Sequence, residues 1–237
     1  MHGIFLGCDV AAGGPVSRGG IMLVSLKIPL SIRVLSFVIL ATEAAGAATY
    51  FVDYTNGNDS YSFEQAQDMA TPWRTWENFQ GSKGASFAPG DEILFKRGET
   101  WLCSEFGEPF KPSAMDSVTF GAYGTGPRPV FDANTDAEGT KVMKIGHNGA
   151  ATNLVFENIE FANSVPTTTK GNLVTAHIAC HHLTFRNCHF DATNMNNTDY
   201  ANLNETLSTD ADYLVVDKCS FYGEPPYNRH AAYAGGR

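Results

Sequence analysis

Two basic residues in the second half of the chain are of the types that cleavage of an acidic sugar polymer requires. Glu157, Arg186 and Asp217 fall at the same place in three similar segments, and Lys218 directly follows Asp217. β-Elimination needs a cation that neutralises the uronate carboxylate and a base that removes the C5 proton. We therefore take Arg186 and Lys218 as candidate catalytic residues. The alternative is a solvated ladder of alternating charges, which contributes little free energy.

A second candidate is the long polar segment 191–212, which contains Asp191, Asp199, Glu205 and Asp210. Long loops on rigid scaffolds often carry function, and calcium prefers several oxygen ligands of this kind. The spacing is not that of an EF-hand. Asp191 is a candidate metal ligand from this segment, and a solvated polar loop is the alternative.

Histidines and cysteines also cluster in sequence, but their expected directions disfavour zinc. They are His177, Cys180, His181, His182, Cys188 and His189. Zinc needs four ligands that converge on one point, whereas the repeat pattern directs Cys188 inward and His189 outward. Cys188 and Cys219 hold equivalent positions in neighbouring repeats. Because cysteine behaves as a small apolar residue, we expect a buried thiol stack there in preference to a disulfide.

The elements that must position these side chains are repeats. Residues 153–161, 182–190 and 213–221 share one pattern, with offsets of 29 (182 − 153) and 31 (213 − 182) residues. A weaker copy begins at Ser117, 36 residues before the first. Repeats of this period that alternate like strands predict a β-solenoid. A β-sandwich is the alternative, but it does not require the same residue types at the same bend three times.

The repeats predict three interior columns, because coils of such a fold stack ~4.8 Å apart and point alternate side chains inward. The columns are Phe156/Phe185/Val216, Ile159/Cys188/Cys219 and Phe161/Phe190/Phe221. Asn158 and Asn187 fall at the bend between two strands. Their amides can hydrogen-bond along the stack and satisfy backbone groups that a tight turn leaves open.

Composition limits the function classes. The 237 residues include 16 basic and 25 acidic side chains, for a net charge of −9, with 43% hydrophobic residues and five cysteines. The apolar content excludes a disordered chain, and the few cysteines exclude a disulfide scaffold. An acidic protein without a basic face is not expected to bind nucleic acid. We predict one folded domain.

Residues 1–47 have the features of a leader. Residues 1–21 show no helical or strand period, and we take Met22 as the true start. Lys27 and Arg33 then precede an apolar run at 34–41, and 45–47 reads Ala-Gly-Ala, a signal-peptidase site. The run is too short to span a membrane, so we predict export without a stable membrane anchor. The protein is therefore expected outside the cell or in the periplasm.

The mature chain is predicted to comprise an N-terminal cap at 48–90 and coils at 91–237. Thr71 and Pro72 are typical of the start of a short helix. Trp73, Trp76 and Phe79 would form one aromatic stripe on that helix. Since an open end of a β-helix exposes unpaired strand edges, we expect this stripe to plug the first coil rather than bind sugar.

Several stretches resemble the secreted right-handed parallel β-helix proteins of the pectate-lyase-like superfamily. These are residues 50–53, 57–60, 71–75, 87–101 and 122–130, together with the three repeats. The resemblance implies an all-β, right-handed parallel β-helix with a short N-terminal capping helix. Residues 216–219, Val-Asp-Lys-Cys, are similar to a stretch that carries a calcium-binding aspartate in pectate lyases, with lysine here in place of histidine. Asp217 is on this basis a candidate calcium ligand.

These features together predict an exported carbohydrate-active protein. Our first hypothesis is a polysaccharide lyase that acts on an acidic polysaccharide. We expect a monomer, with calcium as the candidate cofactor. A non-catalytic glycan-binding adhesin or structural β-helix, and a glycoside hydrolase with two carboxylates, are the alternatives. Residues 227–237 begin what resembles another coil without a terminal cap. We therefore expect the sequence to be the N-terminal part of a longer protein.

Overall fold

The fold is seen in a computed structural model, in which the described residues belong to one compact unit that begins at Ala45. They are residues 46–106, 109–136, 141–166, 172–177, 179–194, 205–209, 212–222 and 230–234. The predicted signal sequence, Asp199 and Asp210 lie outside these residues, and only the backbone of Glu205 is described. No described helix is long and apolar enough to cross a membrane.

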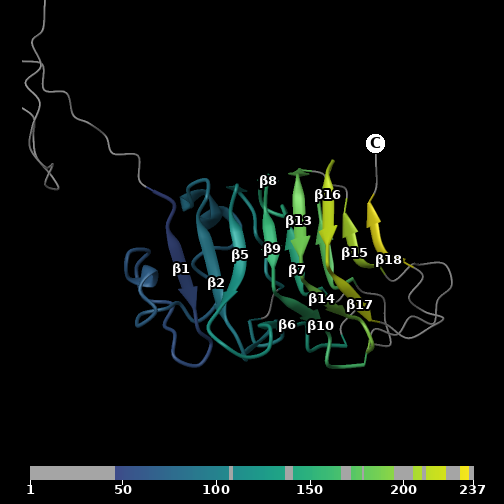
Figure 1. Cartoon of the computed structure of the whole chain (residues 1–237), viewed down its shortest axis with the longest axis horizontal. Helices are drawn as coiled ribbons and strands as arrows, with labels where there is room; N and C mark the ends of the chain where they lie inside the picture. The colour runs from purple at the N-terminus through teal and green to yellow at the C-terminus, as the bar shows by residue number, and fades with distance from the viewer. Residues whose placement is uncertain are drawn as a thin grey trace, which may run out of the picture. The chain divides into compact units, whose positions relative to one another are not determined.

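The described strands are paired in parallel and form a β-solenoid, so the predicted fold class is confirmed (Figure 1). Four sheets run along the stack, and we name them A to D. Sheet A contains, in spatial order, β1 (Thr49–Val52), β2 (Glu92–Lys96), β5 (Thr119–Tyr123), β9 (Val155–Glu157), β13 (Leu183–Arg186) and β16 (Leu214–Asp217). Sheet B contains β3 (Thr100–Leu102), β6 (Val130–Asp132), β10 (Glu160–Ala162), β14 (His189–Asp191) and β17 (Ser220–Tyr222).

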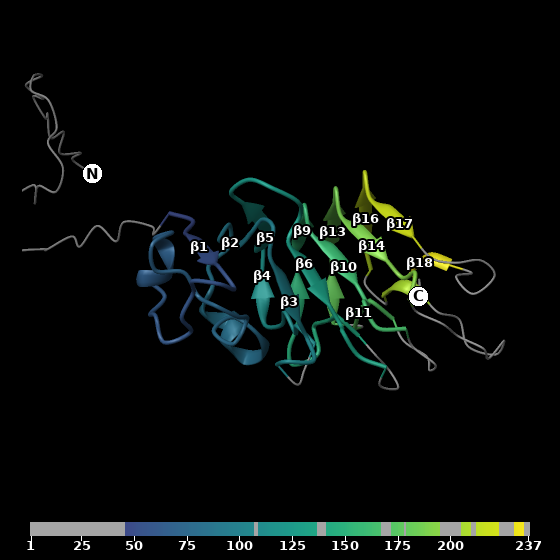
Figure 2. The same cartoon turned by 90° about the horizontal axis from the view of Figure 1, so that it is seen from below.

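The other two sheets complete each coil. Sheet C contains β7 (Met143–Ile145), β11 (Val174–Ala176), β15 (Glu205–Thr209) and β18 (His230–Ala234). Sheet D contains β4 (Met115–Asp116), β8 (Ala151–Thr152) and β12 (Cys180–His181). The chain visits the sheets in the order A, B, C, D before it returns to sheet A one coil further on. Figure 2 shows β6, β10, β14 and β17 of sheet B side by side along the stack.

The interior contains the predicted aromatic columns, except that Val216, predicted to continue the first of them, is 39% exposed. Phe185 stacks on Phe156 with ring centroids 5.1 Å apart, and Phe156 stacks on Phe120 of the weaker repeat at 5.0 Å. Phe190 stacks in the same way on Phe161 (5.1 Å) and Phe221 (4.7 Å). These rings lie in register because the strands that carry them are paired residue for residue.

The predicted thiol stack is also confirmed. Cys188 and Cys219 are free thiols. The Cys188 Sγ donates to the Phe156 carbonyl at 3.4 Å, and the Cys219 Sγ donates to the Phe185 carbonyl, one coil further on, at the same distance. Each thiol thus satisfies its own hydrogen bond within the stack.

A left-handed backbone bend joins sheet A to sheet B. Asn158, Asn187 and Lys218 occupy it with φ values of 61°, 50° and 54°. Asparagine tolerates this conformation better than most residues, and the Asn187 Nδ2 donates to the Asn158 Oδ1 at 2.7 Å. The predicted amide ladder at this bend is therefore present between these two coils.

The predicted helix at Thr71 and Pro72 is wrong. Trp73 instead forms a parallel bridge with Val52: its backbone N–H donates to the Phe51 carbonyl (2.9 Å), and its carbonyl accepts from the Asp53 N–H (2.8 Å). The backbone groups that a helix would use are thereby committed to sheet A. The described helices here are short 3₁₀ turns at Gln65–Gln67 and Gly81–Ser86.

The side chains of the aromatic stripe nevertheless plug the interior as predicted. Trp73, Trp76 and Phe79 are fully buried. Trp73 stacks on Tyr50 of β1 with ring centroids 5.4 Å apart, and the Trp76 ring lies 5.4 Å from that of Phe110. Burial on this scale makes the stripe part of the core.

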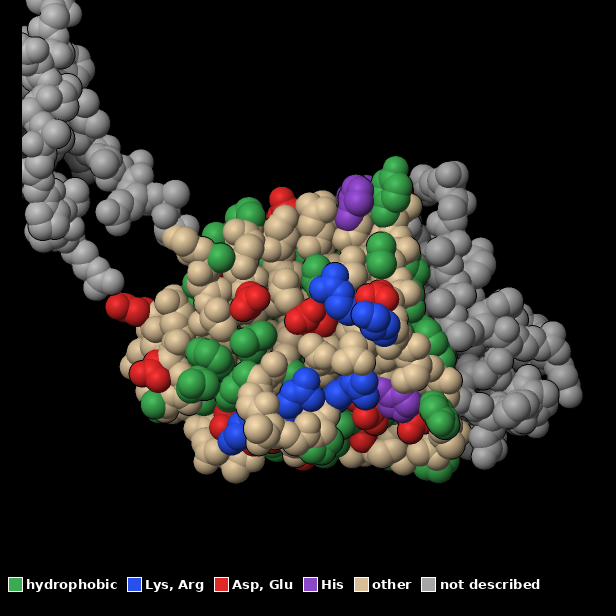
Figure 3. All heavy atoms as spheres, in the orientation of Figure 1, with side chains coloured by type: hydrophobic (Ala, Val, Ile, Leu, Met, Phe, Trp, Pro, Cys, Tyr) green, Lys and Arg blue, Asp and Glu red, His purple; other side chains and the backbone are tan. Residues whose placement is uncertain are grey.

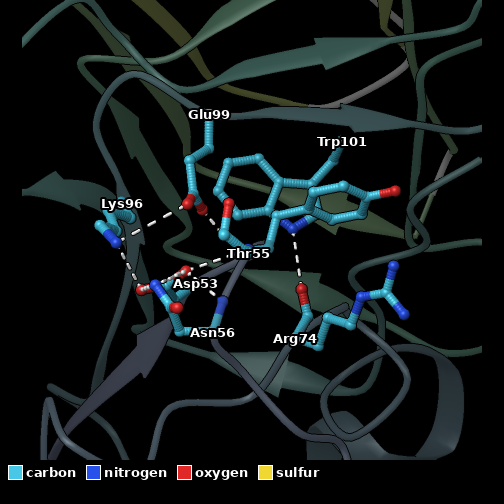
Figure 4. A network of polar contacts seen from close by, with 8 residues as sticks. Asp53, Thr55, Asn56, Arg74, Lys96, Glu99 and Trp101 are labelled. Carbon is cyan, nitrogen blue, oxygen red and sulfur yellow. Dashed lines mark hydrogen bonds and ion pairs between the residues drawn. The ribbon is translucent and has the colours of Figure 1, made fainter.

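A buried carboxylate fixes the segment that follows β1 (Figure 4). The Lys96 Nζ, at the end of β2, lies 2.6 Å from Asp53 Oδ2 and 3.7 Å from Glu99 Oε1. Asp53 Oδ1 accepts from the backbone N–H groups of Thr55 (3.0 Å) and Asn56 (2.8 Å). Burial raises the pKa of Asp53, but the Lys96 ammonium and the Asn56 donors outweigh it and lower that pKa to about 2.

We predict that Asp53→Asn lowers the free energy of unfolding at neutral pH by about 2 kcal/mol, because a carboxylate with so low a folded pKa stabilises the fold when it is ionised. The folded pKa lies below the ordinary value, so this contribution is present above pH 3.8 and is lost as the pH falls towards 2. Urea denaturation of both proteins across this range measures the difference, which should shrink with acidification.

Glu77→Gln is the control, since it removes an exposed carboxylate from the same segment. The role given to the Asp53 charge would be contradicted if wild-type protein and Asp53→Asn differed in free energy of unfolding by the same amount from neutral pH to pH 2.

Candidate functional site

The predicted catalytic residue Arg186 lies on the outward face of sheet A between two carboxylates. Its Nη1 is 3.3 Å from Glu157 Oε2, and its Nε is 3.8 Å from Asp217 Oδ2. Basic and acidic side chains accordingly lie side by side on the face seen in Figure 3. The three residues form a partly exposed ladder with a net charge of −1, which offers no excess positive charge to an anionic polymer.

Lys218 lies at the next position, on the bend between sheets A and B. It is exposed, and it makes no ion pair within the part of the chain that the structure describes. The structure thus brings Arg186 and Asp217 into contact and leaves Lys218 as a separate exposed cation beside them in sequence.

The predicted metal ligand Asp191 lies elsewhere, on the outward face of sheet B. Its carboxylate, the Glu160 carboxylate and the His189 imidazole each offer a ligand atom, and these atoms lie within 4.8 Å of one another. Among the described residues this is the one group of three such side chains, and it does not include Asp217. The two residues predicted as metal ligands are therefore not brought together, and Glu160 and His189 were not predicted.

Sheet C carries a row of residues that the sequence did not single out. A bridge pairs Phe110 with Met143, and the Lys144 N–H donates to the Phe110 carbonyl at 2.8 Å. This pairing places Lys111 next to Lys144 on the outward face. Thr175 of β11 is paired with Lys144 on the other side. The Thr175 Oγ1 is buried and has no hydrogen-bond partner among the described residues.

Two histidines flank this row where the chain leaves sheet C. His147 follows β7, His177 follows β11, and the His147 Nδ1 lies 3.3 Å from the His177 Nε2. A contact at this distance permits one imidazole to donate to the other, so the pair can exchange a proton.

Burial and neighbouring basic side chains lower the pKa of three residues on this face. Burial and the Lys144 ammonium lower the pKa of both Lys111 and Lys141. Burial, His177, Lys111 and Lys144 together lower the pKa of His147 below 6.5. Like charges favour the neutral form. We call Lys111, Lys141, Lys144, His147 and His177 the sheet C basic patch.

The basic patch was missed because its signal in the sequence is weak. Residues 143–147 read Met-Lys-Ile-Gly-His and residues 174–177 read Val-Thr-Ala-His, so the two segments match only when Gly146 is skipped. The strand pairing confirms this alignment for the three strand residues. A search for repeats that allowed single insertions could have found the two histidines, but not Lys111.

Comparisons with known proteins add a fold likeness only. No protein-family profile and no curated protein matches the sequence. Two crystal structures of GH136 lacto-N-biosidase from Eubacterium ramulus are similar to it: the selenomethionine derivative (TM-score 0.42, 14% identity over 74% of this chain) and the native protein (TM-score 0.35, 12% identity over 77%). This chain covers 34% and 39% of their lengths. The resemblance to the pectate-lyase-like superfamily stays a prediction.

We predict that Lys144→Gln raises the pKa of His147 towards its ordinary value, because the substitution removes one of the like charges that lower it. Titration of the imidazole signals by NMR measures this shift. Lys83→Gln, which removes a lysine outside the patch, should leave the His147 pKa unchanged. An identical His147 titration in wild-type protein and Lys144→Gln would show that the patch is not electrostatically coupled.

Proposed function

We propose that this protein is an exported polysaccharide lyase that binds an acidic polysaccharide across the outward face of sheet C. The observation that carries the proposal is the sheet C basic patch, which gathers three lysines and two histidines in a chain of net charge −9. A cluster of basic side chains in an acidic protein favours a specific anionic ligand over general attraction to polyanions.

The spacing of the coils suits a polymer. Lys111 and Lys144 lie on successive coils, which stack ~4.8 Å apart, a distance comparable with the width of one sugar ring. A uronate chain laid along the stack would thus meet one ammonium group at each of these two coils.

The same residues can supply the chemistry of β-elimination. Lys144 would neutralise the uronate carboxylate and so acidify the C5 proton. His147, whose lowered pKa leaves it unprotonated at neutral pH, is the proposed base. The C5–H electrons form the C4=C5 double bond, the C4–O bond breaks, and the departing oxygen takes up a proton. The His177 ring, 3.3 Å from His147, can accept the proton that His147 gains.

Arg186, Lys218, Asp217 and a bound calcium ion remain a rival arrangement on the other side of the solenoid. Arg186 lies there between two carboxylates, whereas on sheet C the Lys144 ammonium lies close enough to other basic groups to lower their pKa. We therefore propose sheet C as the face for an anion. Binding without cleavage, as in an adhesin, is the alternative that the basic patch would equally support.

We predict that the protein produces unsaturated uronide, detected by ultraviolet absorbance, from pectate, alginate or a glycosaminoglycan tested with calcium and with chelator. Lys144→Glu should weaken polysaccharide binding by about tenfold, equivalent to about 1.4 kcal/mol. The effect should fade at high salt, because exposed charges are screened. His147→Ala should abolish the absorbance signal while polysaccharide is still bound.

Lys83→Glu, a matched charge reversal outside the patch, is the control and should bind as wild-type does. Binding without absorbance by the wild-type protein would support the adhesin. A rise in reducing ends without absorbance would indicate a hydrolase. If Arg186→Gln lost polysaccharide binding while Lys144→Glu bound polysaccharide as tightly as wild-type protein, the assignment of the binding site to sheet C would be overturned.

A further inference from the structure

We propose that Glu160, His189 and Asp191 form a site for a divalent transition-metal ion on the outward face of sheet B. The three ligand atoms lie within 4.8 Å of one another. A single ion with ligand distances of ~2 Å bridges atoms up to ~4 Å apart, so small rotations of these partly exposed side chains complete the site. The site is separate from the sheet C basic patch and does not depend on the proposed lyase activity.

The stacking of the coils builds this group. Glu160 of β10 and His189 of β14 are paired in register, so they project side by side from neighbouring strands. Asp191 lies two residues after His189 and therefore on the same face. The residue paired with Asp191 on β10 is Ala162, whose methyl group leaves that side of the carboxylate without a competing polar side chain.

Neighbouring groups hold two of the ligands and leave one atom of each open. The His189 Nδ1 lies 2.7 Å from the Ser220 Oγ, which leaves Nε2 as the nitrogen for an ion. The Asp191 Oδ1 accepts from the Thr193 N–H (2.9 Å) and Thr193 Oγ1 (2.5 Å), which leaves Oδ2. Such outer hydrogen bonds orient metal ligands in known sites.

The charge of the group also favours a cation. Two carboxylates lie within 4.8 Å of each other, and neither forms an ion pair with a lysine or arginine among the described residues. Adjacent like charges are unfavourable unless a proton or a cation relieves them. A bound divalent ion would neutralise both.

The donor set determines which cation fits. Calcium takes six to eight oxygen ligands, whereas this group offers two carboxylates and one imidazole. Imidazole with carboxylate suits zinc, iron or manganese, and three protein ligands leave a position for water. We therefore expect Zn²⁺ to bind more tightly than Mn²⁺, and Ca²⁺ to bind most weakly.

The test is a calorimetric titration of the chelator-treated full chain with ZnCl₂, MnCl₂ and CaCl₂. The His147–His177 pair offers a separate two-ligand position, so every variant is made in a His177→Ala background. His189→Ala and the conservative Glu160→Gln should each weaken zinc binding by about tenfold or more, whereas His182→Ala, a matched loss of an exposed imidazole, should not.

Zinc should also raise the unfolding temperature of the His177→Ala protein, an effect that chelator reverses and that His189→Ala removes. The proposal would be overturned if Glu160→Gln and His189→Ala, made in the His177→Ala background, bound zinc as tightly as the His177→Ala protein itself. It would also be overturned if Ca²⁺ bound more tightly than Zn²⁺. No polysaccharide is present in this titration, so failure to bind metal does not count against the proposed lyase activity. In the same way, a failure of the lyase assay does not count against the metal site.

Discussion

The rest of the structure depends on the parallel, residue-for-residue stacking of one coil on the next. This register places Phe156 on Phe120 and beneath Phe185, and it gives three successive coils the same left-handed bend between sheets A and B, at Asn158, Asn187 and Lys218. Each outward position then becomes a column whose members are neighbours in space although about thirty residues apart in sequence. The coils thus determine which side chains meet on the surface as well as which fill the core.

The outward columns differ in how their charged side chains are arranged. Glu157, Arg186 and Asp217 alternate in sign, so the ladder satisfies itself and adds little to stability. On sheet C the column places Lys111 beside Lys144, and on sheet B it places Glu160 beside His189 and near Asp191. Titratable groups whose neighbours shift their pKa gather more often at functional sites than elsewhere. This contrast is the reason for locating function on sheets C and B.

The sequence predicted the structure correctly in the part of each coil where the repeat has a constant length. Sheets A and B are joined by a short bend, so the pattern of residues 153–161 recurs without insertions. That pattern predicted the fold, the aromatic columns, the Asn158–Asn187 contact and the thiol stack. Sheet C follows loops of unequal length. Lys111, Lys144 and Thr175 follow one another at 33 (144 − 111) and 31 (175 − 144) residues, but no shared sequence pattern around them marks the column. The helix predicted at Thr71 failed for a different reason: local preferences were overridden by the bridge between Trp73 and Val52.

The central claim is that the basic residues of sheet C, and not the ladder of alternating charges on sheet A, bind an acidic polymer. A crystal structure of the protein with a short oligouronate bound tests this most directly. The account predicts the oligosaccharide along sheet C, with its carboxylates at Lys111 and Lys144 and one sugar ring beside His147. An oligosaccharide bound instead over Arg186 and Lys218, with sheet C empty, would contradict it.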